Sequence, residues 1–441
     1  MSQTTAAAAP STASETATPA EGTATTEVLE PLRRNRPFML LMTGLTAQSL
    51  GGSVTRFAVP LLALQLTGSP TAAGLVAAIG QTGALLAALP AGVVADRTDR
   101  RRLVVVAAAT AALLWATVVV AGVLGGLAAW HLAAVLFGAA VATAFLDPAI
   151  SGAFRSVVPQ AQLPTAYATA QGRDAVAGML GGPLGGALYG IAHVVPMVGA
   201  VVGGAATAVC AFFVREPLNG DVDAARATRP LVALRQGLRF VWSVPLFRAC
   251  LGMFVVVNIA LSGMMIGINL ELARTGTAPV LIGVFDMVAA GSMLLGSVLA
   301  PPLVARARLG AVTVVSLGLL VVAFAGMALV QTYVGYVVLI GVGVLLVPAV
   351  NSAMAGYTAA ITPDRMQGRL ASVLGLSGVA AMPVAPLVGG ALLGAGGIGV
   401  VLWSLVALLA ATVVGLALVP SLWRVGAPDA WADDALPMPA E

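Results

Sequence analysis

The stretch from Gly92 to Val104, GVVADRTDRRRLV, is a dense cluster of charge in an apolar chain. Six of the seven residues from Asp96 to Arg102 are charged, whereas only 9% of the 441 residues are charged and 59% are hydrophobic. Long apolar runs lie on both sides of it. Because an ordinary soluble enzyme does not carry so much apolar sequence, this stretch is expected to be a polar loop between two membrane-spanning segments.

Apolar stretches of about 20 residues, the length that crosses a bilayer, recur from Pro37 onward. The sequence predicts twelve of them, and therefore an all-α membrane protein. Pro148, Arg155 and Pro164 interrupt the fourth and fifth segments. The approximate spans are 37–65, 71–94, 103–124, 129–152, 166–190, 194–214, 246–270, 279–304, 311–330, 334–354, 369–392 and 398–419.

The arginines lie in alternate breaks between these segments. They precede the first segment and follow the even-numbered ones, and only Glu271 and Arg274 after the seventh blur the pattern. Because basic loops are retained in the cytoplasm, we expect a multi-pass protein of the inner (cytoplasmic) membrane with both termini cytoplasmic. The arginines that carry this argument are Arg33, Arg34, Arg36, Arg97, Arg100, Arg101, Arg102, Arg155, Arg215, Arg226, Arg229, Arg235, Arg239, Arg306, Arg308, Arg365 and Arg424.

A long polar break over 215–245 divides the twelve segments into two sets of six. Its second part places five apolar residues on one helix face, with Arg235 and Arg239 opposite; these five are Leu231, Leu234, Leu238, Val241 and Trp242. This pattern predicts an amphipathic helix on the cytoplasmic membrane surface; a linker helix without lipid contact is the alternative. The expected parts are a disordered N-terminal tail over 1–36, a six-helix half over 37–214, the linker over 215–245, a second six-helix half over 246–419 and a C-terminal tail over 420–441.

Short repeats indicate that the two halves are related. Pro148-Ala149 corresponds to Pro348-Ala349, and the tetrapeptide GGAL occurs both at Gly185 and at Gly389. The two offsets are nearly equal and join corresponding segments of the two halves. A pseudo-symmetric pair of six-helix halves is therefore expected.

These halves and the opening stretch together resemble the major facilitator superfamily. Its members carry G-x-x-x-D-R-x-G-R-[RK]-x between segments two and three. The matching residues here are Gly92, Asp96, Arg97, Arg100 and Arg101. Asp99 replaces the second glycine, a change associated with the branch that exports drugs, macrolides and siderophores. Because Asp tolerates a left-handed turn, we expect that turn to be retained.

The resemblance implies that this loop latches the cytoplasmic side when the carrier faces outward, with Asp96 near the N-terminal end of segment eleven. Thr362 and Pro363 are expected to be the N-cap and first-turn proline of that helix. A helix dipole attracts an exposed carboxylate by about 0.3–1 kcal/mol, enough to bias a near-balanced carrier. The alternative, a loop that serves orientation only, explains Arg100 to Arg102 but not Asp96.

A second stretch, GMLGGPLGG from Gly178 to Gly186, resembles the antiporter motif of superfamily exporters. The matching residues are Gly178, Gly182, Pro183, Gly185 and Gly186. The motif's earlier glycine falls at Thr169, so the match is partial. Small residues at this spacing let two helix backbones approach closely, and proline supplies a bend. Such packing holds a gate closed against leak; ordinary Gly-rich packing is the alternative.

Charged residues inside membrane segments are costly and mark candidate pathways. Those of this chain are Arg56, Asp147, Arg173, Asp174 and Asp286. Asp147 is expected either to form a structural ion pair with Arg56 or Arg173, or to exchange a proton as the carrier turns over. A related exporter pattern has an acidic residue near Gly52, and its absence here speaks against conventional proton coupling.

Polar residues from both halves are candidates for a central cavity between them. The candidates are Gln48, Gln81, Asn258, Asn269, Asp286 and Asn351. The sequence contains no nucleotide-binding loop, metal-ligand cluster or nucleophile–base arrangement. We therefore expect no enzyme activity, no metal or other cofactor and no nucleic-acid partner.

The expected function is a secondary active transporter that exports small amphipathic compounds, such as drugs, macrolides or siderophores, by alternating access in exchange for protons. Its expected partners are the substrate, protons and the lipid bilayer, and we expect a monomer. An uptake or facilitated-diffusion carrier of the same fold is one alternative. A non-transporting membrane sensor is another, and it would bind substrate without turnover.

Overall fold

The fold was analysed in a computed structural model. It describes residues 31–216, 218, 238–239, 241–426, 428 and 431. Most of the expected N-terminal tail, most of the linker over 215–245 and the end of the C-terminal tail lie outside these residues. The described part of the expected amphipathic helix is helical at 238–239 and 241–243, and Leu238 and Trp242 are exposed there. The last part of the expected tail is ordered, because residues 32–34 form a short 3-10 helix and Asn35 caps the first long helix by accepting from Phe38 N.

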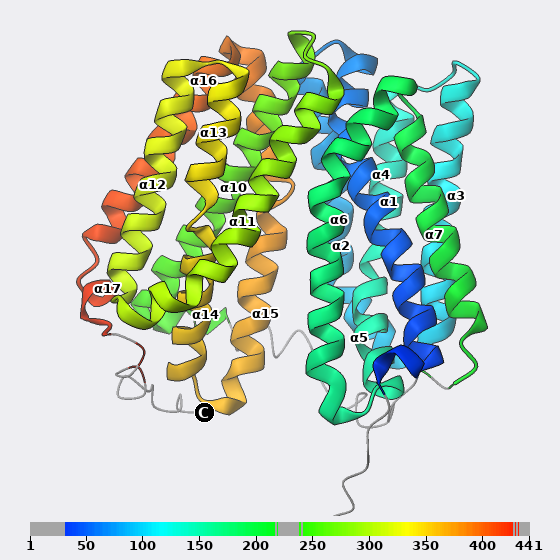
Figure 1. The fold of residues 1–441 in the computed structure, drawn as a ribbon, viewed down its shortest axis with the longest axis horizontal. Coiled ribbons are helices and arrows are strands. Elements are labelled where there is room, and N and C mark those ends of the chain that lie inside the picture. Colours follow the sequence, from blue (N-terminus) through cyan, green and yellow to red (C-terminus); the bar gives the residue numbers. More distant parts are fainter. Residues whose placement is uncertain are drawn as a thin grey trace, which may run out of the picture.

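The first half of the chain is built of long helices that cross the molecule in alternating directions (Figure 1). Polar caps and first-turn prolines define several of their starts, as at Ser69 before Pro70 and at Asp99 before Arg100. The helices are α1 (Arg36–Thr67), α2 (Pro70–Arg97), α3 (Arg100–Val123), α4 (Ala129–Ala144), α5 (Leu146–Val157), α6 (Leu163–Ile191) and α7 (Val195–Phe213).

The second half repeats this arrangement. Its helices are α10 (Pro245–Arg274), α11 (Pro279–Arg306), α12 (Leu309–Val330), α13 (Tyr333–Val344), α14 (Val347–Ile361), α15 (Asp364–Ala381), α16 (Val384–Ala417) and the short α17 (Pro420–Arg424). The helical backbone is interrupted between α4 and α5 and again between α13 and α14. Pro148 and Pro348 lie in the first turn after these two breaks, so the predicted repeat corresponds to a shared kink.

All regular elements of the described residues are helices, and nine stretches among them are long and apolar enough to cross a membrane. The ninth, Val373–Ala417, contains a reversal at Gly396 and Gly397 and includes parts of two crossings. Polar residues dilute the apolar runs of α1 and α6, which are not among the nine. With these two helices, the described helices are consistent with twelve crossings. The predicted all-α membrane fold in two six-helix halves is confirmed.

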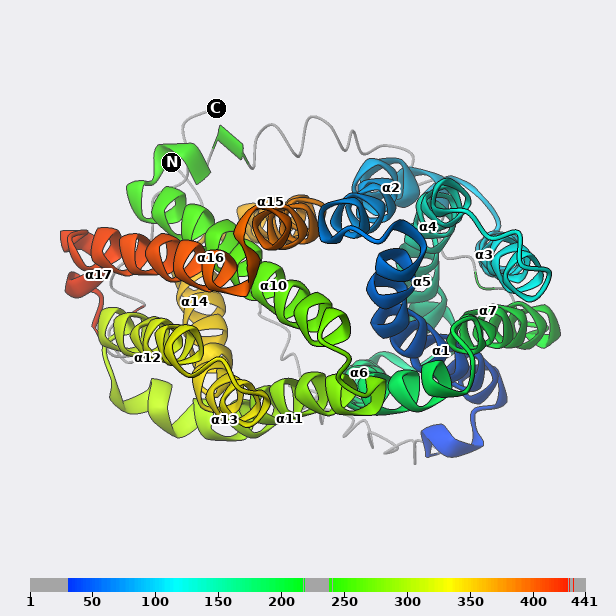
Figure 2. The same ribbon diagram turned by 90° about the horizontal axis from the view of Figure 1, so that it is seen from above.

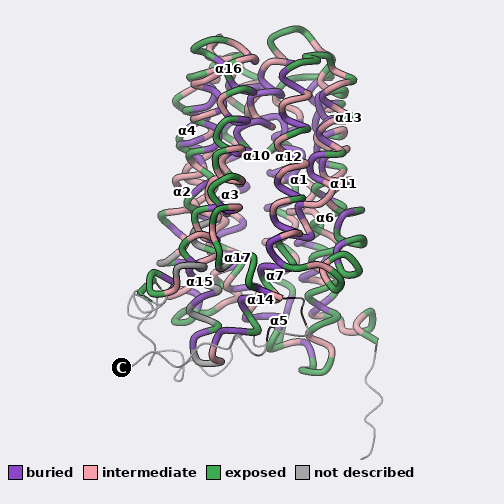
Figure 3. The backbone as a smooth tube through the Cα atoms, turned by 90° about the vertical axis from the view of Figure 1, so that its left-hand side faces the viewer, coloured by how far each residue is buried: buried purple, intermediate pink, exposed green. Residues whose placement is uncertain are grey.

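Two ends of the molecule differ in sequence and in packing. The Arg-rich end holds Arg97, Arg155, Arg306 and Arg424, the basic residues at the ends of α2, α5, α11 and α17. The opposite end holds the turns with left-handed backbone, at Gly68, Gly125, Gly276, Gln331 and Gly397. Many large apolar side chains between these ends, such as Leu113, Val298 and Val322, are exposed over 60% of their surface. Residues coloured as exposed occur along the length of the helices (Figure 3), as expected for a surface that faces lipid.

The buried core shows where the halves meet. One apolar cluster joins both halves and includes Phe57, Leu132 and Tyr189 from the first and Phe285 and Leu402 from the second. Two other clusters each stay within one half at the Arg-rich end, one around Phe38 and Phe154 and one around Phe247 and Tyr357. The halves are therefore packed together toward the opposite end, and each has a core of its own at the Arg-rich end. Seen along the helices, α2 lies beside α15 and α16, and α6 lies beside α11 (Figure 2).

Candidate functional site

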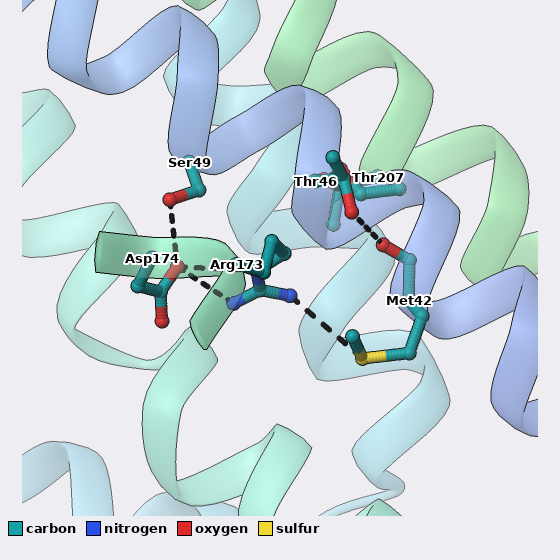
Figure 4. A network of polar contacts seen from close by, with 7 residues as sticks. Met42, Thr46, Ser49, Arg173, Asp174 and Thr207 are labelled. Carbon is teal, nitrogen blue, oxygen red and sulfur yellow. Dashed lines mark hydrogen bonds and ion pairs between the residues drawn. The ribbon is translucent and has the colours of Figure 1, made fainter. Parts of the chain in front are cut away.

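A polar network joins α6 to α1 in the middle of the first half (Figure 4). Asp174 Oδ1 accepts from the hydroxyl of Ser49 at 2.6 Å and from Nη2 and Nε of Arg173 at 2.8 and 3.1 Å. Arg173 Nη1 also lies 3.9 Å from Met42 Sδ. The Arg173 side chain is 15% exposed and that of Asp174 is 54% exposed. The network therefore presents a partly accessible carboxylate, with its arginine partner largely covered.

Asp147 stands near this network but is not bonded to it. It lies in the first turn of α5, is exposed, and is close enough to Asp174 and Arg173 for both charges to act on it. The described residues show no ion pair from Asp147 to either Arg56 or Arg173, so the predicted pair is wrong for this structure. The reason is local, because Asp174 takes two donors of the adjacent Arg173. Arg56 on α1 is exposed, and no ion pair or hydrogen bond is described for it.

The predicted cavity residues do not form one cluster. Asn258 on α10 and Asn351 on α14 are exposed, and Asn258 donates to Phe254 O in its own helix. Gln48 on α1 and Gln81 on α2 are half-buried, and Gln48 Oε1 has no hydrogen-bond partner among the described groups. Asp286 is half-buried, accepts from Asn269 on α10 and lies beside Gly182 of α6.

Sequence reasoning missed a cavity of about 380 Å³ between α11 and α14. Its lining includes Ser297, Pro301 and Val304 from α11 and Pro348 and Ser352 from α14. None of the six predicted cavity residues is among the residues that line it. In the sequence, Pro348 is marked by the internal repeat. Nothing in the local pattern distinguishes the other lining residues from core residues.

The glycines of the antiporter-like stretch pack α6 on two neighbours. Gly182 and Gly186 face α11 in the other half, where a Cβ on Gly182 would lie 2.6 Å from Gly283 O and a Cβ on Gly186 would lie 2.3 Å from Pro279 O. Gly185 faces Val54 and Phe57 of α1, and Pro183 lies inside the helix. We call the contact of Gly182 and Gly186 with Pro279 and Gly283 the α6–α11 seam.

An equivalent contact joins α2 to α16. A Cβ on Gly74 would lie 2.4 Å from Pro386 O, and one on Gly390 would lie 2.5 Å from Pro70 O. In the sequence, Gly390 stands out only as part of the repeated tetrapeptide GGAL. Toward the Arg-rich end, by contrast, Gly92 on α2 and Gly178 on α6 have no atom within 4 Å of an added Cβ. The backbones are therefore in close contact toward the opposite end and not at these two positions.

The charged loop between α2 and α3 is bound to the first half of the chain. Arg100 packs against Gly152 of α5 and donates to Leu218 O at 3.1 Å. Arg101 donates to Phe212 O and lies over the Phe212 ring, 5.4 Å from its centroid. No hydrogen bond or ion pair is described for Asp96 or Arg97, both of which are exposed. The contact of Asp96 with the eleventh segment that the resemblance implies is not among the described contacts.

Two predictions about local backbone are wrong. Asp99 does not adopt a left-handed turn, because its φ is −63° and its carboxylate caps α3 by accepting from Arg102 N at 3.0 Å. Thr362 is not the N-cap of the eleventh segment, because α15 begins at Asp364 with Pro363 at the cap, and Thr362 Oγ1 is buried without a partner. In the first case the capping requirement of α3 outweighs the turn that a glycine would support.

Comparison with known proteins identifies the fold. The Major Facilitator Superfamily model matches residues 38–351. No curated protein sequence matches the chain.

Three solved structures are similar across most of the chain. A bacterial homologue of the human lysosomal transporter Spinster, described as inward-facing and unoccupied, is 16% identical, with a TM-score of 0.63 over 93% of this chain and 100% of that one. The nucleoside transporter NupG is 11% identical, with a TM-score of 0.65 over 88% of this chain and 100% of that one. A bacterial homologue of the iron transporter ferroportin is 16% identical, with a TM-score of 0.65 over 87% and 99%.

Proposed function

Because the chain belongs to the major facilitator superfamily, we propose that it is a secondary active transporter that exports small amphipathic compounds in exchange for protons. The observation that carries this proposal is the position of the Arg173–Asp174 network and of Asp147. These charged groups are partly exposed within membrane-crossing helices, where a charge is costly unless it serves a pathway. The structural neighbours differ in the substrates that their names state, so the amphipathic substrate class rests on the resemblance to the drug and siderophore branch.

Alternating access explains why the two ends are packed differently. The α6–α11 seam and the contact between α2 and α16, which together we call the two seams, hold the halves together toward the opposite end. The separate cores at the Arg-rich end let each half move as a unit. In this conformation substrate would enter from the Arg-rich end, which we assign to the cytoplasm. Both termini would then be cytoplasmic, and the transporter would work as a monomer in the cytoplasmic membrane.

Rocking of the halves would separate the seams and bring the Arg-rich ends together. Asp96 would then approach the N-terminal end of α15, where helix-dipole attraction of about 0.3–1 kcal/mol would stabilise the outward-facing state. Arg100 and Arg101 anchor the loop to α5 and α7, so Asp96 would move with the first half as a rigid part. The contact of Asp96 with α15 is thus expected to be absent in the conformation described here and present in the outward-facing state.

Proton exchange is assigned to Asp147. Its exposure gives it access to water, and the charges of Asp174 and Arg173 both act on it. A cationic or amphipathic substrate bound beside the network would change that electrostatic balance. Binding of substrate would therefore favour loss of the proton, and return of the empty carrier would favour its uptake.

Replacing Asp147 with asparagine tests this assignment. Purified protein in liposomes with an inside-acid pH gradient is expected to release protons when amphipathic drugs are added, and Asp147→Asn is expected to reduce this to the level of protein-free liposomes. The neutral amide keeps the size of the side chain but carries no exchangeable carboxyl proton. Lumenal pH and labelled-drug flux are measured in parallel, with Glu271→Gln as a control carboxylate, whose ion-pair partner Arg274 has a side chain that is 52% exposed.

The possible outcomes separate the alternatives. Proton release that persists in Asp147→Asn would move the exchange site to another residue. Drug flux without proton movement would contradict proton antiport, and drug binding without flux would identify a sensor. The direction of net flux against a substrate gradient distinguishes an exporter from an uptake carrier.

A further inference from the structure

A second polar pair lies outside the Arg173–Asp174 network, between α10 and α11. Asn269 Nδ2 donates to both carboxylate oxygens of Asp286, at 3.1 and 3.2 Å. Asn269 is only 8% exposed, and its other polar atom, Oδ1, is buried with no hydrogen-bond partner among the described groups. The amide therefore holds a carboxylate while leaving a buried acceptor unused.

No cation among the described residues compensates the charge of Asp286. Among the described residues, the Asn269 amide is the group that bonds to its carboxylate. Glu271 and Arg274 pair with each other, as do Arg173 and Asp174. The charged or titratable side chains on α11 itself and on the elements packed against it are Tyr167, Arg173, Asp174 and Tyr189 of α6, Arg248, Cys250, Glu271 and Arg274 of α10, Arg306 of α11, Tyr333 and Tyr336 of α13, and Tyr357 of α14. Asp286 is half-buried in this conformation, and a carboxylate charge that is partly removed from water without a paired cation is costly.

The pair is able to hold a proton without losing its hydrogen bond. When Asp286 is charged, the amide NH2 of Asn269 donates to it, as observed. When Asp286 is protonated, its hydroxyl becomes a donor, and the unused Oδ1 of Asn269 becomes a suitable acceptor after rotation of the amide. Both charge states of Asp286 are thus satisfied by one neighbour.

The pair also lies on the α6–α11 seam. A Cβ on Gly182 would lie 3.2 Å from Asp286 Cβ, and Gly283, less than one turn earlier on α11, makes the closest backbone contact of the seam with Gly182. Separation of α6 from α11 would therefore expose the half-buried Asp286 further. Water would then solvate the carboxylate charge, whereas closure of the seam would bury it again.

We propose that Asp286 and Asn269 form a proton-binding site that couples protonation to closure of the α6–α11 seam. The proposal rests on the proposed function, because it supplies the step that lets protons from the opposite end drive the return to the conformation described here. The proton would bind the exposed carboxylate while the seam is open. The neutral pair would then be buried as α6 and α11 close, and the charged pair would favour reopening.

The test measures the seam directly, without substrate. Spin labels are placed at Ala192→Cys in the α6–α7 turn and at Thr275→Cys in the α10–α11 turn, on a background in which Cys210 and Cys250 are replaced by alanine. Distances are recorded by double electron–electron resonance in lipid nanodiscs from about pH 5 to about pH 8, a range that brackets carboxylates shifted by burial. We expect a short distance at low pH and a growing long-distance population at high pH.

Asp286→Asn is expected to keep the short distance at every pH, because it mimics the neutral pair. Asn269→Ala is expected to move the midpoint to higher pH, since the charged form loses both donors. Asp286→Glu is expected to retain a pH response with a moved midpoint, because the longer side chain places its carboxyl group differently against Asn269. An unmoved midpoint would contradict the proposal even if the asparagine variant does not fold. Glu271→Gln, a carboxylate change toward the same end of α10, is expected to behave like the parent.

A seam that responds to pH equally in the parent and in Asp286→Asn would overturn the proposal. So would loss of the response in Asp147→Asn alone, or the same distance change produced by Na⁺ at constant pH. Failure of drug transport in liposomes with the seam response intact would instead contradict the proposed export function and leave this site standing.

Discussion

Replacing Gly182 with valine should open the α6–α11 seam and sharply reduce transport. A Cβ at this position would meet Gly283 O at 2.6 Å and Gly283 Cα at 3.1 Å, and these are backbone atoms that have no rotamer to change. Overpacking of this kind costs about 1–3 kcal/mol, which corresponds to about a 5- to 150-fold shift between two conformations. The favoured conformation becomes the one in which α6 and α11 are apart.

The measurement combines transport in liposomes with the label distance between residues 192 and 275. Gly182→Val is expected to lengthen the distance at every pH and to slow transport by about the same factor as the population shift. Gly190→Val is the matched control, because Gly190 lies on the same helix with no atom within 4 Å of an added Cβ. A valine at 182 that leaves both distance and transport unchanged would show that the seam is not a gate.

The fold follows from the sequence because its signals are long and additive. A crossing needs about 20 apolar residues, so runs such as 103–124 and 311–330 remain visible despite local noise, and they correspond to α3 and α12. The internal repeat was also informative. Pro148 and Pro348 mark kinks at corresponding places in the two halves, because the same break in a helix needs the same residue in the same turn.

The site was harder to predict because it depends on which side chains meet. Asp147, Arg173 and Asp174 stand out as charges in membrane segments, but their spacing does not say that Asp174 takes the arginine. Ser49 and Asn269 complete the two polar clusters. Asn269 is a cavity candidate in the sequence, but nothing in its helix indicates that it binds Asp286, and Ser49 is an ordinary residue within its own helix. Pairing across helices is set by helix rotation and approach, which short glycine-rich contacts decide.

Glycines illustrate the same limit most clearly. The stretch from Gly178 to Gly186 predicts a close approach of two helices, but its spacing does not say which glycine makes which contact. In the structure Gly182 contacts the other half and Gly185 contacts α1, whereas a Cβ added to Gly178 would have no atom within 4 Å. A glycine that permits movement and a glycine that holds one half together therefore carry the same sequence signal. Substitution separates them, since the first kind should change the balance of conformations and the second should change stability.

Gly51 is the strongest case of the second kind. An added Cβ would lie 1.9 Å from Gly199 O and 2.5 Å from Gly199 C, in the contact between α1 and α7 inside the first half. Valine at this position should therefore lower the melting temperature in detergent by about 5–10 °C, or prevent folding, because overpacking against backbone is destabilising. The neighbouring Gly52→Val adds the same volume where no atom lies within 4 Å, and its melting temperature should stay near that of the parent. Equal melting temperatures for the two variants would mean that α1 and α7 are able to move apart without loss of stability, and the first half would then not act as the rigid unit that alternating access requires.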